Sequence, residues 1–341
     1  MNERIIALDG LHTSISVRSG ETLLAALERC GYKMRRSCRN GVCEICQITL
    51  LEGEVEQRYP AGRFQAPQSA ILACTATALS DLRVYIEGLQ MPGVLAVKKV
   101  ICEITETEKL NHDVYRIRLH MPATASHAVE YYAGQYLNVL LPTGKQASFS
   151  IASAPDMGRE LELHIRHIPE SEMSSAIVDH LLNNPSVEIE LPRGDCYVQA
   201  TEMKDDTQLI MAAASTGFAQ VKSMVEHLLA NQHHNPIHVY WGARNADDFY
   251  LADLPEQWAH EHSHVTMTRV VEPDAASAWQ GRTGLLPAAI LEDFTEFDNT
   301  LVIGAGSPGM VYALLDACEA AGMKEEQLKS DVFAYAPRPK K

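Results

Sequence analysis

Four cysteines of this chain follow a spacing that few folds can accommodate. Cys38, Cys43 and Cys46 lie in one short segment in the order C-x4-C-x2-C, and Cys74 follows after a gap of 27 residues. This is the ligand spacing of a plant-type 2Fe-2S cluster, in which thiolates hold the iron. Gly41 lies where the backbone of such a loop must pass close to inorganic sulfide. The spacing therefore predicts an iron–sulfur domain with these four thiols as a rigid cage of ligands.

A zinc site is the alternative for the same thiols. Structural zinc sites are usually built from two C-x2-C pairs, and here only Cys43 and Cys46 form one. The remaining cysteines stand singly in apolar or helical contexts. They are predicted to be small buried side chains: Cys30, Cys102, Cys196 and Cys318.

The charge of the chain excludes one class of partner. A formal net charge of −15 argues against a nucleic-acid ligand, because phosphate contacts need clustered Lys and Arg. The one basic cluster is near Cys38: Lys33, Arg35, Arg36 and Arg39. The N-terminus does not resemble a signal peptide, and no apolar run approaches the roughly 18 residues of a membrane span. We therefore expect a soluble, cytoplasmic protein with no membrane span.

The length allows two or three domains, and the element pattern divides the chain into three. Residues 1–92 alternate short strands with one helix, residues 98–202 are rich in strands, and residues 205–341 alternate strands with helices. In the first part we expect a helix after residues 19–22 that ends near Gly31, strands at 47–51 and 81–87, and a linker at 88–93.

The second and third parts of the chain differ in the pattern of their apolar residues. Alternation and frequent turn signals in the second part predict a small antiparallel barrel. The third part has the rhythm of a parallel α/β sheet with helices on both faces, which would place a nucleotide beyond the carboxyl ends of the strands. The clearest expected strands are 114–119, 161–166, 208–211, 237–241 and 300–303, and the expected helices are 221–230 and 311–321.

Five phrases of the sequence carry a resemblance. They are AGQY at 133–136, FSIAS at 149–153, TGF at 216–218, YWGAR at 240–244 and GAGSPGM at 304–310. Together with the thiol spacing, they resemble the ferredoxin-NADP reductase superfamily, in the branch where a plant-type ferredoxin domain precedes an NAD(P)H-flavin reductase module. Phenol hydroxylase reductase and CDP-6-deoxy-glucoseen reductase are built this way. The resemblance implies a β-grasp ferredoxin domain, a flavin-binding antiparallel β-barrel and an NAD(P)H-binding α/β domain.

The resemblance also implies flavin-binding residues. Phe149 and Ser150 occupy the aromatic and hydroxyl positions of the family's Arg-x-Tyr-Ser motif, where the ring packs near the isoalloxazine and the hydroxyl, assigned as catalytic, reaches its reactive edge. The resemblance also assigns to the flavin Ile151, which follows them, and Tyr136, which ends the AGQY phrase. Ser174, before a helix at 176–182, matches the hydroxyl that meets the flavin phosphate. An ordinary inward strand residue remains the alternative for Phe149, and a plain helix cap for Ser174.

Ala147 departs from the family at the motif arginine, which contacts the flavin phosphate. A charge-assisted hydrogen bond of this kind contributes about 1.5–3 kcal/mol, so the flavin affinity is expected to fall by about one or two powers of ten. Lys145 and Arg166 offer partial compensation. The resemblance favours FAD, with FMN as the alternative.

The nicotinamide residues follow from the same resemblance. Thr216 and Gly217 stand where a strand turns into a helix, so backbone amides there can face a pyrophosphate. Ala214 and Ser215 replace two glycines that the family usually has just before this turn. The loop of Gly306, Ser307 and Pro308 is expected to support the nicotinamide over the flavin, and Ala305 replaces a cysteine of many reductases.

NADH is expected to be preferred over NADPH. A 2′-phosphate needs cations just after the second strand of the nucleotide domain, and carboxylates there repel it. Arg244 is the only cation in that stretch, and Asp247 and Asp248 follow it. The two aspartates are alternatively exposed helix-start residues that ignore the cofactor.

The order of the three expected redox groups, nicotinamide, flavin and cluster, predicts the function. A nicotinamide delivers two electrons as hydride, a flavin releases them singly, and a 2Fe-2S cluster accepts one at a time. We expect an NAD(P)H-dependent iron–sulfur flavoprotein reductase that serves a partner protein such as an oxygenase or a dehydratase. Two alternatives stay open: a flavin reductase that releases reduced flavin, and a redox-sensing or assembly module with decayed flavin and nicotinamide sites.

Overall fold

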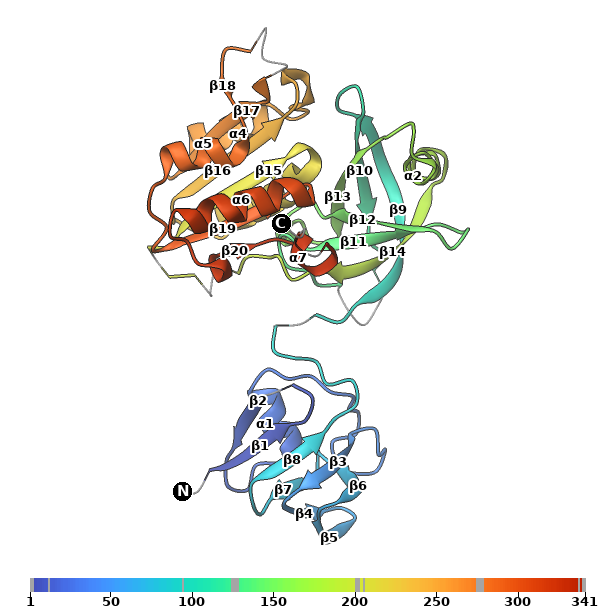
Figure 1. The fold of residues 1–341 in the computed structure, drawn as a ribbon. Coiled ribbons are helices and arrows are strands. Elements are labelled where there is room, and N and C mark those ends of the chain that lie inside the picture. Colours follow the sequence, from blue (N-terminus) through green and yellow to red (C-terminus); the bar gives the residue numbers. More distant parts are fainter. Residues whose placement is uncertain are drawn as a thin grey trace. The chain divides into compact units, whose positions relative to one another are not determined.

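The computed structural model describes residues 3–11, 13–93, 95–123, 129–199, 203–204, 206–273, 279–336 and 338. The chain forms two compact units, Met1–Ala96 and Val97–Lys341 (Figure 1). In the described ranges, no helix is both long and apolar enough to cross a membrane.

The first unit contains two small sheets and one helix. Its five-stranded sheet has the order β2-β1-β8-β3-β6, in which β1 and β8 are parallel and the other neighbours antiparallel. A three-stranded antiparallel sheet has the order β5-β4-β7. The elements are β1 (Arg4–Leu8), β2 (Thr13–Val17), α1 (Leu23–Arg29), β3 (Gln47–Glu52), β4 (Glu54–Arg58), β5 (Ala61–Gln65), β6 (Gln68–Leu72), β7 (Ala76–Ala78) and β8 (Leu82–Tyr85).

Helix α1 begins where the sequence predicts it. The Thr22 hydroxyl caps the helix by accepting a hydrogen bond from the Ala25 amide at 3.2 Å, and the apolar stripe of the helix is buried in the core of this unit. The predicted linker is partly tied to the same unit, because Gln90 and Lys33 exchange two backbone hydrogen bonds of 2.8 and 3.0 Å.

The second unit begins with a six-stranded antiparallel sheet in the order β12-β11-β14-β9-β10-β13. Its two edge strands meet, because Ile151, just after β12, forms an isolated bridge with Leu163 of β13. The elements are β9 (Lys98–Lys109), β10 (Val114–His120), β11 (Tyr136–Leu140), β12 (Gln146–Ser150), β13 (Glu160–Arg166), α2 (Glu172–Asn183) and β14 (Ser186–Arg193).

A six-stranded parallel sheet completes the second unit, in the order β18-β17-β16-β15-β19-β20. The elements are β15 (Gln208–Ala214), α3 (Phe218–Ala230), β16 (Ile237–Ala243), α4 (Asp253–Glu261), β17 (Val265–Val271), β18 (Arg282–Thr283), α5 (Leu286–Asp293), β19 (Thr300–Ala305), α6 (Pro308–Ala320), β20 (Leu328–Lys329) and α7 (Val332–Tyr335). The strands and helices expected in this part are therefore present.

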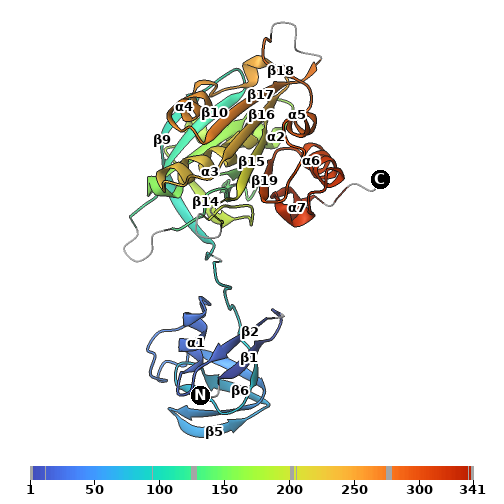
Figure 2. The same ribbon diagram turned by 90° about the vertical axis from the view of Figure 1, so that its left-hand side faces the viewer.

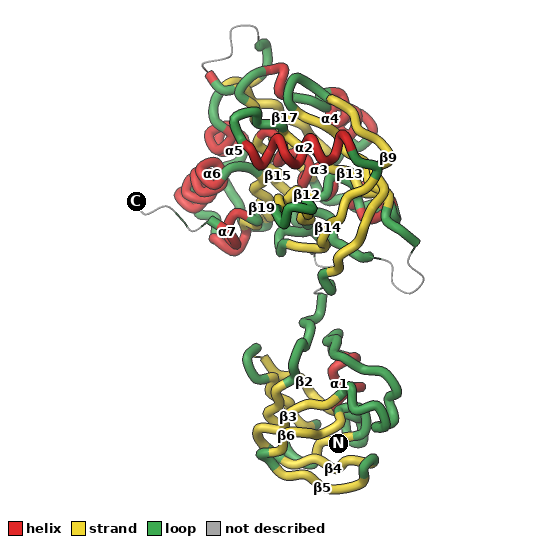
Figure 3. The backbone as a smooth tube through the Cα atoms, turned by 90° about the vertical axis from the view of Figure 1, so that its right-hand side faces the viewer, coloured by secondary structure: helices red, strands yellow, loops and turns green. Residues whose placement is uncertain are grey.

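Helices cover both faces of the parallel sheet (Figures 2 and 3). Met211 of β15 faces a core shared with α3 and α4, while its neighbour Ile210 faces a core shared with α5 and α6. Because successive side chains of a strand point to opposite faces, a sheet covered on both sides needs the continuous apolar runs that the sequence has. Of the single cysteines, Cys102, Cys196 and Cys318 are buried as predicted, and Cys30 is half-buried.

Candidate functional site

The four thiols of the first unit stand in two pairs. Cys38, Cys43 and Cys46 lie between α1 and β3, and Cys74 follows β6. The amide of Cys43 donates to Sγ of Cys38 at 3.3 Å, and the side chains of Cys46 and Cys74 are hydrogen-bonded to each other. Among the described residues, no group of three or more His, Cys, Asp or Glu side chains is placed to hold a metal ion, and the four thiols stay the predicted cluster ligands. A 2Fe-2S cluster would need two thiolates for each of its two irons, and the two pairs of thiols match this requirement.

The backbone of the thiol loop requires its glycine. Gly41 has φ of +88°, and a Cβ atom there would lie 2.8 Å from the carbonyl oxygen of Tyr59. Arg39 and Glu44 also adopt left-handed backbone conformations, with φ of 59° and 58°. Non-glycine residues in this region are strained by about 1–3 kcal/mol each, and such strain concentrates at functional loops.

Backbone amides of the loop stabilise negative charge on sulfur. Hydrogen bonds from the backbone of Asn40, and then of Cys43, lower the pKa of Cys38 to about 6. Burial, and after it the hydrogen bond with Cys46, raises the pKa of the Cys74 thiol to about 11. Iron would hold both sulfurs as thiolates, because a coordinating thiol is deprotonated. The amide donors and the glycine loop therefore fit an iron–sulfur cluster.

The basic cluster near Cys38 is partly neutralised. Glu28 of α1 accepts hydrogen bonds from both Arg36 and Arg39, the latter with an Nη2–Oε1 distance of 2.9 Å. Two apolar side chains of the same loop, Val42 and Ile45, are 66% and 48% exposed. The surface beside the thiols is therefore more apolar and less cationic than the sequence suggests.

A second candidate site lies where the strand order of the parallel sheet reverses. From β15, the chain proceeds outward to β16, β17 and β18 on one side, and β19 and β20 lie on the other. Ligands of open α/β sheets bind at such a switch point, beyond the carboxyl ends of the strands. Thr216 and Gly217 follow β15, and Gly306 and Ser307 follow β19, so both predicted turns meet at this position.

The first cavity at this point, which we call the Phe149 cavity, has a volume of about 550 Å³. Residues from β11 and β12 form one wall, and the turns after β15 and β19 form another. It collects seven of the predicted residues: Tyr136, Phe149, Ser150, Thr216, Gly217, Gly306 and Ser307. The flavin and nicotinamide residues predicted from separate phrases therefore share one cavity.

Two glycines allow the turns to approach each other. A Cβ atom on Gly217 would lie 2.2 Å from the carbonyl oxygen of Ala305, and one on Gly306 would lie 3.0 Å from Cβ of Ala214. The first distance is impossible for a Cβ atom, so close packing requires Gly217. The second is tighter than most Cβ contacts, so a side chain at position 306 would force Ala214 to shift. The turn also contains Ser215 with φ of 53°, where a glycine would be unstrained.

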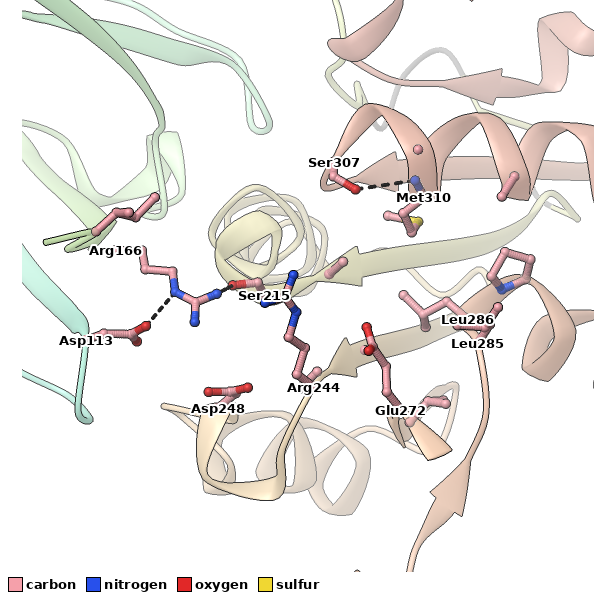
Figure 4. Close-up of a pocket in the computed structure, with 18 of the residues that line it drawn as sticks. Asp113, Arg166, Ser215, Arg244, Asp248, Glu272, Leu285, Leu286, Ser307 and Met310 are labelled. Carbon is pink, nitrogen blue, oxygen red and sulfur yellow. Dashed lines mark hydrogen bonds and ion pairs between the residues drawn. The ribbon is translucent and has the colours of Figure 1, made fainter. Parts of the chain in front are cut away.

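The adjoining Arg244 cavity has a volume of about 770 Å³ and shares Ala214, Ser215 and Ser307 with the Phe149 cavity (Figure 4). Arg166 lines this cavity and not the Phe149 cavity. Its guanidinium donates to Asp113 at 2.5 Å and to the Ser215 hydroxyl at 3.2 Å. The cation expected to help the flavin therefore lies among residues of the second cavity and is already paired.

Three predicted residues line neither cavity. Ile151 is buried and bridges to Leu163, and Pro308 is the first residue of α6. The Ser174 hydroxyl donates to the carbonyl of Arg166 and accepts from the amide of Ile168, while Ser171 caps α2. The roles assigned to these three residues stay predictions.

The C-terminal wall of the Phe149 cavity was not expected from the sequence, and it includes Ser330, Asp331 and Tyr335. Burial raises the pKa of Asp331 to about 6, although Gln220 donates a hydrogen bond to its carboxylate at 2.8 Å. A carboxyl group shifted in this way inside a cavity is a functional-site signal. No local pattern marks Asp331, which reaches the cavity only because β20 packs beside β19.

Comparisons with known proteins define the class of the chain. Residues 6–79 match the 2Fe-2S iron-sulfur cluster binding domain, residues 101–197 the oxidoreductase FAD-binding domain, and residues 211–315 the oxidoreductase NAD-binding domain. The chain is thus an oxidoreductase with iron–sulfur, flavin and nicotinamide domains. The zinc alternative has no support from these matches.

Full-length relatives define the family. The chain is 33% identical to protein RfbI of Salmonella typhimurium over 329 residues, which cover 96% of both chains. It is 31% identical to the CDP-6-deoxy-L-threo-D-glycero-4-hexulose-3-dehydrase reductase of Yersinia pestis, over 92% of this chain and 93% of the relative. The chain belongs to the ferredoxin-NADP reductase superfamily, in its branch with a 2Fe-2S domain.

Solved structures share the fold. The Amycolatopsis cytochrome P450 reductase GcoB aligns with a TM-score of 0.64 and 23% identity, over 96% of this chain and 98% of that one. The ferredoxin reductase of carbazole 1,9a-dioxygenase aligns with a TM-score of 0.62 and 20% identity, over 97% and 98%.

Proposed function

We propose that this protein takes hydride from NADH and passes the electrons one at a time, through flavin and a 2Fe-2S cluster, to a partner protein. The observation that carries the proposal is the adjoining pair of cavities at the switch point, which brings the predicted flavin and nicotinamide residues together. Bound flavin would accept two electrons from the nicotinamide and supply single electrons to the cluster.

The residue roles follow the walls of the cavities. Tyr136, Phe149 and Ser150 would face the isoalloxazine, with the Ser150 hydroxyl as the catalytic hydrogen-bonding group. Thr216, Gly217 and the Gly306–Ser307 turn would hold the nicotinamide and the phosphates beside it. Cys38, Cys43, Cys46 and Cys74 are the proposed cluster ligands.

The finer fold description is part of the proposal. A β-grasp fold for the first unit is supported by the mixed five-stranded sheet with α1. A closed barrel is supported by the bridge between Ile151 and Leu163. Domain limits of 1–92, 98–202 and 205–341 enclose the three family matches. The cytoplasmic location stays a prediction from the sequence.

The acceptor is proposed to be an oxygenase or dehydratase component. Among the relatives, one is named for a hexulose dehydrase and another, from Comamonas, for terephthalate 1,2-dioxygenase. The exposed side chains of Val42 and Ile45, beside half-buried Cys38 and Cys43, would offer an apolar contact close to the cluster.

The proposal is tested on protein loaded with iron, sulfide and FAD and then freed of unbound flavin. NADH added without oxygen is expected to bleach both the flavin and the cluster absorption and to support reduction of cytochrome c. Bleaching of neither chromophore would contradict the proposed function.

A flavin reductase that releases its flavin is the second candidate, and the residues that the resemblance places at the flavin phosphate favour it. Ala147 supplies no cation, Lys145 is paired with Glu172 at 2.7 Å, and the Ser174 hydroxyl is already engaged. In the same experiment, loss of flavin on desalting together with NADH oxidation only in the presence of added flavin would identify this activity.

We expect a higher kcat/KM for NADH than for NADPH. Asp248 and Glu272 both line the Arg244 cavity, where their carboxylates would repel a 2′-phosphate, while Asp247 does not line it (Figure 4). The Glu272→Gln variant should therefore narrow the preference several-fold, and Asp247→Asn serves as the matched control. Steady-state kinetics with both nucleotides measure the effect, and a wild-type preference for NADPH would contradict the prediction.

A further inference from the structure

Helix α3 buries three polar side chains in its first two turns. Gln220, Lys222 and Ser223 are 3%, 7% and 0% exposed. All three donate hydrogen bonds to main-chain carbonyls of the antiparallel part of the unit: Gln220 to Gly134 at 2.7 Å, Lys222 to Ala152 at 3.3 Å and Ser223 to Ser153 at 2.7 Å. These carbonyls belong to the two phrases assigned to flavin binding, AGQY and FSIAS.

Lys222 is the charged member of this group and has two carboxylate partners. Its Nζ lies 3.3 Å from Oε1 of Glu162 and 2.9 Å from Oε2 of Glu226. Glu162 of β13 also contacts Nε2 of buried His164 at 2.9 Å, and Nδ1 of His164 lies 3.1 Å from the Tyr250 hydroxyl. A buried cation without these partners would destabilise the fold, so the network holds the Lys222 ammonium group in one place.

The position of Lys222 connects the two walls of the Phe149 cavity. The turn Ser215–Gly217 immediately precedes α3 and forms the nicotinamide wall, and Ala152 follows Ser150 of the flavin wall by two residues. A shift of α3 against the antiparallel sheet would therefore change the separation of the two walls. The main-chain carbonyl and the Glu162 carboxylate resist such a shift, because both bond to the same ammonium group.

We propose that Lys222 is a positioning residue, which sets the distance between the nicotinamide wall and the flavin wall through its bonds to Ala152 and Glu162. This inference rests on the proposed function. Hydride transfer requires the donor and acceptor atoms at about 3–3.5 Å, and a misplacement of about 1 Å can slow a reaction about 100-fold. The role of Lys222 is thus geometric, and it does not contact the reacting atoms.

The test compares Lys222→Met with Lys222→Arg and with the double variant Lys222→Met/Glu226→Gln, which removes the carboxylate that Lys222→Met would leave without its cation. Single-turnover reduction of bound flavin by NADH is expected to slow about ten-fold or more in Lys222→Met and in the double variant. The long-wavelength absorbance of the nicotinamide–flavin complex should weaken with it, while the Kd for NADH changes little. Lys222→Arg should retain most of the rate and the absorbance.

Asn231→Ala is the matched control, because Asn231 bonds Asp156 at the far end of the same helix and lines neither cavity. Amide exchange at residues 215–219, measured without nucleotide, should accelerate in Lys222→Met and not in the control. Wild-type rate, absorbance and exchange in the double variant would overturn the inference. A wild-type protein whose flavin is not reduced by NADH would instead contradict the proposed function.

Discussion

Replacing Cys74 by serine is expected to remove the visible absorption of the cluster and to abolish electron transfer from NADH to cytochrome c. Cys74 is 5% exposed, and its thiol is hydrogen-bonded to that of Cys46. A serine hydroxyl there is a poor substitute for a thiolate, which is the ligand that an iron–sulfur cluster requires. NADH-driven reduction of added flavin should persist, because it needs only the cavities of the second unit.

The control for this experiment is Cys30→Ser. Cys30 is a half-buried thiol of the same unit that lies outside the proposed ligand set. It should keep both the cluster spectrum and the cytochrome c activity. A Cys74→Ser protein with an unchanged spectrum and unchanged one-electron activity would remove the iron assignment.

The Asp331→Asn variant is expected to be more stable than the wild type at neutral pH. Burial raises the pKa of Asp331 to about 6, from an ordinary value of 3.8. The folded protein therefore disfavours the ionised carboxylate, and the cost is present in full above pH 6 and disappears below the unfolded pKa near 3.8. At about 1.4 kcal/mol per pKa unit, removing the charge should raise the free energy of unfolding by about 1–3 kcal/mol at pH 7.5 and by little at pH 4.

Tryptophan fluorescence can follow this unfolding in urea, because Trp241, Trp258 and Trp279 all belong to the second unit. Asp293→Asn is a control of opposite sign. Arg282 and Tyr240 bond the Asp293 carboxylate and help to hold its pKa below the usual value against the effect of burial, so neutralising it should lower stability at pH 7.5. An Asp331→Asn protein no more stable than the wild type at pH 7.5 would show that the fold accommodates this charge without cost.

The charge of the thiol loop depends on a contact that the sequence does not reveal. Glu28 lies in α1, eight residues before Arg36 and 11 before Arg39, and it pairs with both. Counted along the chain, the loop is strongly basic; in the folded unit, much of that charge is offset. In the proposed docking, the exposed apolar side chains of Val42 and Ile45 would therefore contribute more to the contact than the paired arginines.

The sequence by itself determined what depends on local pattern. The ligand spacing at Cys38–Cys46, the cap of α1 at Thr22 and the apolar runs of β15, β16 and β19 are each written in a few neighbouring residues. Gly217 and Gly306 were also singled out from the sequence, because each lies in a turn that follows an expected strand. These features predicted both the class of fold and the location of the cavities.

Only the tertiary structure decided which distant side chains meet. Asp331 joins the Phe149 cavity, Arg166 joins Asp113 and Ser215 beside the Arg244 cavity, and Lys222 meets Glu162 across 60 residues of sequence. The Ser174 hydroxyl, whose role at a flavin phosphate stays a prediction, is hydrogen-bonded to the backbone at residues 166 and 168. Such pairings depend on strand register and on how helix α3 packs against the antiparallel sheet. No short stretch of sequence encodes them, because each partner is selected by the packing of the whole unit.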